Sequence, residues 1–286
     1  MVWTYLNNDF IKKDEVRISP FDRGFLFGDG VYEVIPVYDH KSFLLDDHID
    51  RLARSLFLTK INKPKVWKNI PQIIDKLVKK NNFNNQSVYL QITRGVDSTR
   101  SHIPENNVEP TLFITSSELK VNPFRINPER DRLEMNLIED PRWDRCDVKS
   151  VILLPNVLAM NEAVKEGKDG VLFYKEGNIT EGASFNVFAV FDNLVVTTPE
   201  SKRILSGVTR KHIINILNKK KVKVLEGQLE LKKIFEADEV WITSSTQEIQ
   251  PVGKIEDKEL VFKPTHESLW FDILKIYFES ELKIKS

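Results

Sequence analysis

Apolar and polar residues follow regular patterns along the chain, and two patterns near the N-terminus predict hairpins. The segments VWTYL and FIKK flank Asn7 and Asn8, and the segments YEVIPVY and KSFLL flank Asp39 and His40. Short polar residues of this kind are typical of tight turns between strands. Each pair of segments therefore predicts two antiparallel strands.

Two helices are predicted next, each from apolar residues at helical spacing. Asp46 and Asp47 mark the start of the first helix, and four residues are expected on its buried face: Ile49, Leu52, Leu56 and Phe57. The buried stripe of the second helix consists of Ile70, Ile73, Ile74, Leu77 and Val78. Proline fits a helix only in its first turn, so this helix is expected with Pro71 in that turn.

A long polar stretch, residues 95–110, separates two predicted strands. Val88, Leu90 and Ile92 alternate with polar residues in SVYLQIT, and the segment TLFIT covers residues 111–115. A loop of this length inside a compact domain is more often functional than idle. We therefore expect residues 95–110 to contribute to a site.

The rest of the chain mixes strands and helices, after a segment with two prolines and little periodicity at residues 120–130. Strands are expected over residues 133–138 and in GVLFY, SFNVFAVF and VWITSS. Helices are expected over residues 155–166, over residues 208–219 and from about Thr265, the last with Leu269, Ile273, Ile276 and Tyr277 on one face. The pattern predicts an α+β fold with mixed sheets and flanking helices. Its expected parts are a smaller N-terminal α/β domain (1–119), a linker (120–130) and a larger C-terminal domain (131–286).

Composition narrows the function classes. The 286 residues are 41% hydrophobic and 29% charged, with 42 basic against 42 acidic residues, which is typical of a globular protein and gives no general attraction to nucleic acid or anionic lipid. No apolar run approaches the ~20 residues of a membrane span. The N-terminus lacks a secretory pattern and Cys146 is the single cysteine, so a cytoplasmic protein is expected. The five histidines are scattered, and no metal site is expected.

The immediate sequence context of three residues bears on whether they could take part in chemistry. Lys149 lies among apolar residues and could act as an amine nucleophile or base, although spacing alone favours a strand-end lysine whose ammonium reaches water. Glu181 is expected in a small-residue turn between two strands, either solvated there or holding a cationic heterocycle nitrogen. Cys146 is expected to be a small buried packing residue rather than a nucleophile.

Six motifs, in the same order along nearly the whole chain, make the sequence similar to a known family. They are DRGFLFGDGVYE, HIDRL, RCDVKS, ITEGASFNVF, ILSGVTR and WITSSTQEIQPV. Together they resemble the fold-type IV pyridoxal-phosphate transaminases, which include the branched-chain and D-amino-acid transaminases and the aminodeoxychorismate lyases. The resemblance implies pyridoxal 5′-phosphate as the cofactor and a two-domain fold.

The resemblance also implies roles for individual residues. Lys149 would bond to the cofactor and, once displaced by substrate, move the proton at the substrate Cα, while Glu181 would pair with the pyridine nitrogen. The cofactor phosphate would be held by a further set: Arg51, Val208, Thr209, Ser244 and Ser245. Without the family context, an ion pair of Arg51 with Asp47 or Asp50 on the helix surface is the plainer interpretation.

Substrate choice depends on Arg100 and His102, which form an Arg-x-His pair inside the long loop. The pair resembles the carboxylate trap of D-amino-acid transaminases, where it reaches in from the partner subunit of a homodimer and a tyrosine matching Tyr32 assists. The expected function is transfer of an amino group from a D-amino acid to a 2-oxo acid such as 2-oxoglutarate or pyruvate. For the Arg-x-His pair, the alternative is a solvated polar loop without a role in binding. For the whole protein, the alternatives are a branched-chain L-amino-acid transaminase, an aminodeoxychorismate lyase, and a non-catalytic scaffold that binds the cofactor or has lost it.

Overall fold

The computed structural model describes residues 2–260 and 264–279 and divides the chain into two compact units. Unit 1 is Met1–Lys120 together with Val148–Ile152, and unit 2 is Val121–Asp147 together with Leu153–Ser286. The short segment with Lys149 thus joins unit 1, although unit 2 precedes and follows it in the sequence. The domain bounds expected from the sequence, 1–119 and 131–286, stay a prediction.

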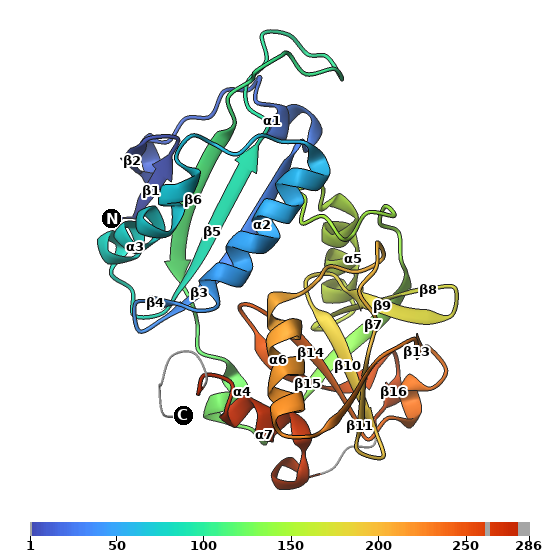
Figure 1. Ribbon diagram of the computed structural model, residues 1–286. Coiled ribbons are helices and arrows are strands. Elements are labelled where there is room, and N and C mark those ends of the chain that lie inside the picture. The colour runs from blue at the N-terminus through green and yellow to red at the C-terminus, as the bar shows by residue number, and fades with distance from the viewer. Residues whose placement is uncertain (1, 261–263, 280–286) are drawn as a thin grey trace. The chain divides into compact units, whose positions relative to one another are not determined.

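Unit 1 is built on a six-stranded antiparallel sheet in the order β2-β1-β6-β5-β3-β4 (Figure 1). Its strands are β1 (Trp3–Leu6), β2 (Asp9–Lys12), β3 (Gly30–Tyr38), β4 (Lys41–Ser42), β5 (Gln86–Thr93) and β6 (Thr111–Glu118). Both predicted hairpins are confirmed, and Asn7, Asp39 and His40 take the positive φ angles that their turns require. Residues 95–110 connect β5 to β6 with no helix or strand beyond an isolated bridge at Val96.

Two helices, α2 (Leu45–Thr59) and α3 (Ile70–Asn81), pack on this sheet around a common core. The predicted stripe of α3 is confirmed, since all five of its residues are buried and Pro71 lies in the first turn. In α2, Leu52 and Leu56 are buried as expected, but the prediction for Phe57 is wrong because its side chain is 81% exposed. One residue beyond Leu56 is a rotation of about 100° around the helix, which turns Phe57 away from the core.

The shorter helical elements of unit 1 are α1 (Arg23–Phe27) and the 3-10 turns η1 (Lys13–Glu15) and η2 (Trp67–Asn69). Asp22 caps α1 by accepting a hydrogen bond from the Gly24 N–H at 2.8 Å. Gly28 ends the helix with a φ angle of 66°, the left-handed conformation that glycine adopts without strain. The chain then turns directly into β3.

Unit 2 is built on a ten-stranded mixed sheet whose main path is β12-β11-β10-β14-β15-β7-β8-β9-β13, with β16 paired to β15 (Figure 1). The pairs β15/β7, β7/β8 and β11/β12 are parallel and the other pairs are antiparallel. The strands are β7 (Leu133–Glu139), β8 (Gly170–Lys175), β9 (Asn178–Gly182), β10 (Asn186–Phe191), β11 (Leu194–Thr197), β12 (Lys223–Glu226), β13 (Leu229–Glu230), β14 (Glu239–Ser244), β15 (Glu248–Ile255) and β16 (Lys258–Glu259). The predicted α+β class is confirmed.

The helices of unit 2 are α4 (Pro123–Ile126), α5 (Leu154–Lys165), α6 (Val208–Lys219) and α7 (Leu269–Lys275), with 3-10 turns η3 (Ile234–Glu236) and η4 (Thr265–Glu267). The predicted bounds of α6 are confirmed, and those of α5 are confirmed to within one residue. The terminal helix differs, because α7 begins only at Leu269 and ends before Ile276 and Tyr277. Its start is fixed by the carboxylate of Glu239, which accepts the N–H groups of Leu269 and Trp270 at 2.7 and 3.0 Å.

Candidate active site

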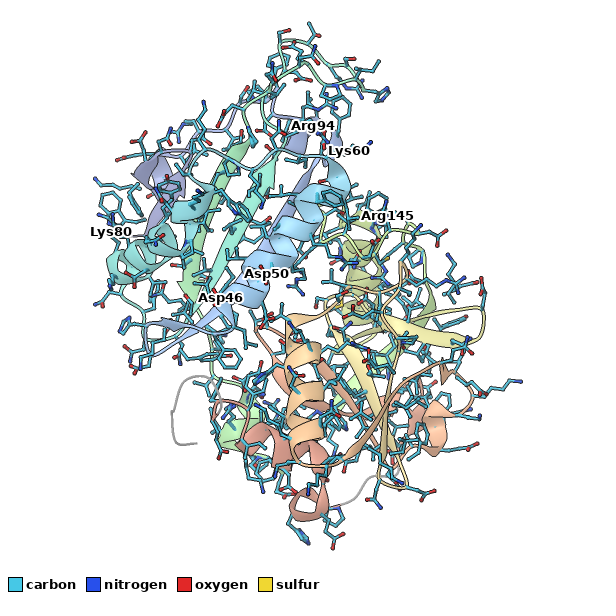
Figure 2. The ribbon with its side chains drawn as sticks, viewed as in Figure 1. Asp46, Asp50, Lys60, Lys80, Arg94 and Arg145 are labelled. Carbon is cyan, nitrogen blue, oxygen red and sulfur yellow. The ribbon has the colours of Figure 1, made fainter. Side chains whose placement is uncertain are left out.

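Arg51 belongs to a buried charged cluster in unit 1 with Glu33 of β3 and His48 of α2. The Arg51 guanidinium donates through Nε and Nη2 to the two carboxylate oxygens of Glu33, each at 2.7 Å. His48 Nδ1 lies 2.7 Å from Glu33 Oε2. Arg51 is therefore buried and bidentate rather than exposed on the helix surface, whereas Asp46 and Asp50 of the same helix are exposed (Figure 2).

Opposite effects set the charges of this cluster. Burial alone would raise the pKa of Glu33, but the Arg51 charge and the hydrogen bonds from Arg51 and His48 outweigh burial and lower that pKa to about 2. Burial lowers the pKa of His48 by more than Glu33 raises it, so the imidazole is neutral at pH 7. The guanidinium of Arg51 thus remains fixed in place by an ionised carboxylate.

Acidification is expected to destabilise the protein through this cluster. Below pH 6.5, His48 binds a proton more readily in the unfolded chain than in the folded chain, because its folded pKa is lowered. Glu33 does the same between pH 4.5 and about 2. The free energy of unfolding therefore falls as the pH falls through both ranges. The Glu33 contribution is on the order of 3 kcal/mol at full ionisation. Denaturant unfolding of wild type and Glu33→Gln between pH 7 and 3 measures it. Parallel pH profiles for the two proteins would contradict the prediction.

The segment Val148–Ile152 places Lys149 against β3 in unit 1. The Tyr32 N–H donates to the Lys149 carbonyl at 3.0 Å, the Val151 N–H donates to the Gly30 carbonyl at 3.1 Å, and Val31 and Ser150 form a bridge. The half-buried ammonium of Lys149 lies 4.3 Å from the centre of the Tyr32 ring. The structure therefore brings together two of the predicted site residues that are more than 100 positions apart in the sequence.

The other predicted pair of unit 1, Arg100 and His102, is exposed on the long loop. Both side chains contact Phe27 of α1: the guanidinium carbon of Arg100 lies 4.9 Å from the ring centre, and the His102 ring lies 5.6 Å from it. Among the described residues, no hydrogen bond, ion pair or ring contact joins this pair to Tyr32 or Lys149. Arg100 and His102 thus both contact Phe27 and are exposed to solvent.

Glu181 is buried in strand β9 of unit 2, so the expectation of a turn is wrong. Its strand pairs with β8 up to Gly182, and the small residues begin only after that point. The carboxylate accepts hydrogen bonds from Arg142 Nη1 at 2.6 Å, from Asn186 Nδ2 at 3.1 Å and from the Leu205 N–H at 3.1 Å. Three donors therefore fix both oxygens of Glu181.

Arg142 joins Glu181 to a second buried carboxylate, that of Asp140. Its Nε and Nη2 donate to the two oxygens of Asp140 at 2.9 and 2.7 Å. Burial raises the pKa of Glu181 and the charge and hydrogen bonds of Arg142 oppose that rise, whereas the pKa of Asp140 is lowered because the Arg142 bonds outweigh burial. Sequence reasoning missed this role of Arg142, although the residue lies only seven positions before Lys149.

The start of helix α6 lies beside Glu181, as Asn186 shows. Asn186 Nδ2 donates both to Glu181 and to the Leu205 carbonyl, the latter at 3.0 Å, in the segment that leads into the helix. Gly207 precedes the helix, and a Cβ there would lie 1.9 Å from Asn186 Oδ1, so only glycine permits this approach. Val208 and Thr209 follow as the first helical residues, whose N–H groups have no acceptor within the helix. Glu181 is thus hydrogen-bonded to Asn186 and to Leu205, and Leu205 lies three residues before Val208, the first residue of the helix.

The predicted serines of unit 2 lie at and just beyond the end of β14, the strand that pairs with the strand of Asn186. Asn186 is the cross-strand partner of Thr243, and Ser244 follows directly. Ser244 Oγ accepts a hydrogen bond from the Gln247 N–H at 3.2 Å, and Ser245 lies in the turn between these two residues. The Thr243 hydroxyl is buried and makes no hydrogen bond to any described residue. Sequence reasoning missed both Asn186 and Thr243, although both lie inside the quoted motifs.

Cys146 is a buried packing residue, as predicted. Its Sγ contacts the Trp143 carbonyl at 3.2 Å, and burial raises the pKa of the thiol to about 12. Across residues 2–260 and 264–279, no three His, Cys, Asp or Glu side chains are arranged to hold a metal ion. In the same ranges, none of the helices combines the length and the apolar character needed to cross a membrane.

Known proteins are similar to this chain in sequence and in fold. Residues 30–255 match the family model described as amino-transferase class IV. The D-alanine aminotransferase of Staphylococcus haemolyticus is 34% identical over 264 residues, 91% of each chain. That of Listeria monocytogenes is 36% identical over 256 residues, 88% of this chain and 86% of the relative.

Solved branched-chain aminotransferases share the fold at lower sequence identity. The enzyme of Thermoproteus uzoniensis has a TM-score of 0.87 at 20% identity and covers 99% of this chain and 96% of its own. The enzyme of Escherichia coli has a TM-score of 0.87 at 20% identity, with 100% and 96% covered. A further branched-chain enzyme, solved with pyridoxamine 5′-phosphate, has a TM-score of 0.88 at 21% identity, with 98% and 93% covered. The predicted fold-type IV architecture is confirmed, and the chain belongs to the class IV aminotransferase family.

Proposed function

We propose that this aminotransferase uses pyridoxal 5′-phosphate to transfer the amino group of a D-amino acid to a 2-oxo acid such as 2-oxoglutarate or pyruvate. The observation that carries the proposal is the pair Arg100 and His102, exposed and held on one aromatic ring. The 32–36% identity to D-alanine aminotransferases supports the same substrate class. The branched-chain structural neighbours, at 20–21% identity, support the fold alone.

The residues present fit pyridoxal 5′-phosphate. Lys149 offers an amine to its aldehyde, and Glu181 offers the pyridine nitrogen a carboxylate that Arg142 helps to keep ionised. The first N–H groups of α6, the guanidinium of Arg51 and hydroxyl groups provide the donors for a phosphate. We assign the hydroxyl donors to Thr209, Ser244 and Ser245, and the unpartnered hydroxyl of Thr243 lies next to the two serines in the sequence.

When bound, this cofactor supplies an electron sink for the carbanion formed at the substrate Cα. Lys149 would hold the cofactor and, once displaced by the substrate, would move the proton from the substrate Cα to the C4′ carbon of the cofactor, acting first as general base and then as general acid. Glu181 keeps the ring nitrogen protonated, because an ionised carboxylate stabilises the adjacent positive charge. Glu33 and His48 orient Arg51 without contacting the reacting atoms.

Handedness follows from where the substrate carboxylate is held. Lys149 acts from one face of the cofactor, so the Cα–H bond must point toward that face. Moving the carboxylate anchor to the other side of the pocket exchanges the enantiomer that meets this condition. Arg100 and His102, with Tyr32 assisting, are proposed as the anchor that selects D-amino acids.

We also propose a homodimer in which the partner subunit supplies Arg100 and His102 to the site. In unit 2, four apolar residues recur at helical spacing on α5 with exposed side chains: Leu154, Val157, Leu158 and Val164. In unit 1, Phe25 and Ile103 are also exposed. Apolar faces of this kind mark protein–protein contacts. Analytical ultracentrifugation checks the proposal, and a monomer at micromolar concentration would contradict it.

The proposed compartment is the cytoplasm. The chain has one cysteine, and its buried thiol cannot form an internal disulfide. Fractionation of cells that produce the full chain checks this assignment, and recovery of the protein outside the cytoplasmic fraction would contradict it.

Product analysis tests the function itself. D-alanine and 2-oxoglutarate are expected to yield pyruvate and D-glutamate. L-glutamate formed from L-leucine would instead support the branched-chain alternative, and pyruvate released from aminodeoxychorismate without an amino acceptor would support the lyase. A protein that transfers no amino group from any donor would support the non-catalytic alternative.

Replacing Arg100 with methionine is expected to raise the KM for D-alanine by roughly 10- to 100-fold, with a smaller change in kcat. A charge-assisted hydrogen bond to a carboxylate contributes about 1.5–3 kcal/mol, and this one is made in the bound state as well as in the transition state. Steady-state kinetics over a range of D-alanine concentrations measure the change. Arg54→Met, at an exposed position of α2, is the control, and an unchanged KM in Arg100→Met would refute the carboxylate anchor.

A further inference from the structure

We propose that Arg23 and Phe27 are positioning residues that fix the loop of Arg100 and His102, and thereby determine how tightly the substrate carboxylate is bound. The substrate part of this inference rests on the proposed function. The anchoring itself is a property of unit 1 and can be measured without substrate.

The side chain of Arg23 binds the backbone of the loop. Its buried guanidinium donates through Nη1 to the Ser101 carbonyl at 2.7 Å and through Nη2 to the His102 carbonyl at 3.2 Å. Nη1 also donates to Asp97 Oδ2 at 2.7 Å, near the start of the loop. One side chain therefore connects α1 to both ends of the turn that carries Arg100 and His102.

Two carboxylates allow Arg23 to remain charged in this buried position. Its Nε donates to Asp29 Oδ2 at 2.9 Å, in addition to the bond with Asp97. Burial lowers the pKa of Arg23, but the bonds and charges of the two aspartates outweigh burial and raise that pKa above its ordinary value. The planar fork of an arginine reaches four acceptors at once, which the single ammonium of a lysine cannot do.

Phe27 holds the side chains of the same loop. The guanidinium carbons of Arg23 and Arg100 lie 4.8 and 4.9 Å from its ring centre, and the His102 ring lies 5.6 Å away at an angle of 50°. A cation over an aromatic face is attracted by the electrons of the ring, so this contact restrains the Arg100 side chain. The backbone of the loop is thus fixed by Arg23, and its two functional side chains are fixed by Phe27.

Arg23 is connected to helix α2 through Asp29 and Arg94. Arg94 donates to the two Asp29 oxygens at 2.7 and 2.9 Å. It also donates to the carbonyls of Lys60 and Thr59 at 2.7 and 3.0 Å, where α2 ends (Figure 2). A guanidinium at this position satisfies the terminal carbonyls of the helix and its partial negative charge. The loop is therefore tied to the helix that carries Arg51.

A fixed loop binds a carboxylate more tightly than a loose one. Residues 98–103 are exposed and contain no helix or strand, so without Arg23 and Phe27 their order would have to be created on binding, at the expense of affinity. Neither Arg23 nor Phe27 is assigned a contact with the reacting atoms. The two residues should therefore affect KM, with little effect on the rate of the half-reaction at saturating substrate.

The test uses Arg23→Lys and Phe27→Leu in the cofactor-loaded full chain. Arg17→Lys, at an exposed position, and Phe83→Leu, at a half-buried one, are the matched controls in unit 1. Hydrogen exchange measured by mass spectrometry without substrate should be about 10-fold faster over residues 98–103 in both test variants and unchanged in the controls. The KM for D-alanine should rise about 10-fold, while the saturated half-reaction rate stays within about 2-fold.

Unchanged loop exchange in folded test variants would overturn the anchoring, and so would a raised KM without faster exchange. Melting temperatures show whether each variant is folded. Phe27→Leu decides the question if Arg23→Lys does not fold, because it leaves the hydrogen bonds of Arg23 intact. A wild-type protein without activity on D-amino acids would refute the proposed function, whereas the exchange comparison would still test the anchor.

Discussion

Replacing Lys149 with alanine is expected to lower turnover by about 10⁴-fold or more. Removal of a general base or acid alone costs about 10²–10⁴-fold, and this lysine is also assigned the covalent attachment of the cofactor. The amine lies against Tyr32 on a segment that is hydrogen-bonded to β3, so it is held in a defined place that a flexible surface lysine would not reproduce. The loss should therefore appear in kcat even at saturating substrate.

A mass measurement separates loss of attachment from loss of folding. Borohydride reduction of the cofactor-loaded wild type should fix one cofactor to the peptide that contains Lys149, and Lys149→Ala should retain none. Lys76→Ala, at an exposed position of α3 in the same unit, should behave as wild type. Near-normal turnover in Lys149→Ala, or attachment at another lysine, would refute the assignment.

Replacing Arg142 with methionine is expected to destabilise the protein by about 3–5 kcal/mol at pH 7 and to remove most of its activity. The substitution leaves the buried carboxylates of Asp140 and Glu181 without their shared cation. Burial already raises the pKa of Glu181, and loss of Arg142 would raise it further. A carboxyl group with a higher pKa is less fully ionised at pH 7, and it therefore holds a charged ring nitrogen less well.

The loss of stability in Arg142→Met is expected to depend on pH, because the substitution raises the pKa of Glu181. A carboxyl group whose folded pKa is raised stabilises the fold at low pH, and that stability is lost as the pH rises from the ordinary value of 4.5 through the raised pKa. Arg142→Met should therefore lose stability between pH 5 and 7 relative to wild type in denaturant unfolding. Arg145→Met is the control, because Arg145 forms a partly exposed ion pair in the same stretch (Figure 2). Equal stability of Arg142→Met and wild type at both pH values would contradict the account.

Local patterns predicted much of the fold because local physics determines those elements. The buried stripe of α3 and the bounds of α6 follow from helical periodicity, and the turns at Asn7 and Asp39 follow from residues that tolerate positive φ angles. The predicted phosphate ligands Val208 and Thr209 do lie at a helix start. Ordered motifs added the assignments of Lys149 and Glu181, which spacing alone favoured as ordinary surface or turn residues.

What the sequence could not predict depends on contacts between distant residues. Arg23 binds the carbonyls of the loop across 78 and 79 positions, and Glu33 binds Arg51 across 18 positions and from a different element. No local pattern encodes either pairing. Glu181 was expected in a turn because small residues surround it, but its pairing with β8 makes it part of a strand. Lys149 joins unit 1 through hydrogen bonds between its segment and β3, which no local pattern indicates either.

Stereochemistry of the first half-reaction tests the central claim most directly. Purified protein loaded with pyridoxal 5′-phosphate is mixed separately with D-alanine, D-glutamate, L-glutamate and L-leucine, and the yellow absorbance band of the cofactor is followed over a single turnover. The account predicts rapid loss of the band with the D-amino acids and little change with the L-amino acids. Loss of the band with L-leucine or L-glutamate alone would contradict the D-specific anchor at Arg100 and His102. A protein that never acquires the band would contradict the cofactor assignment as well.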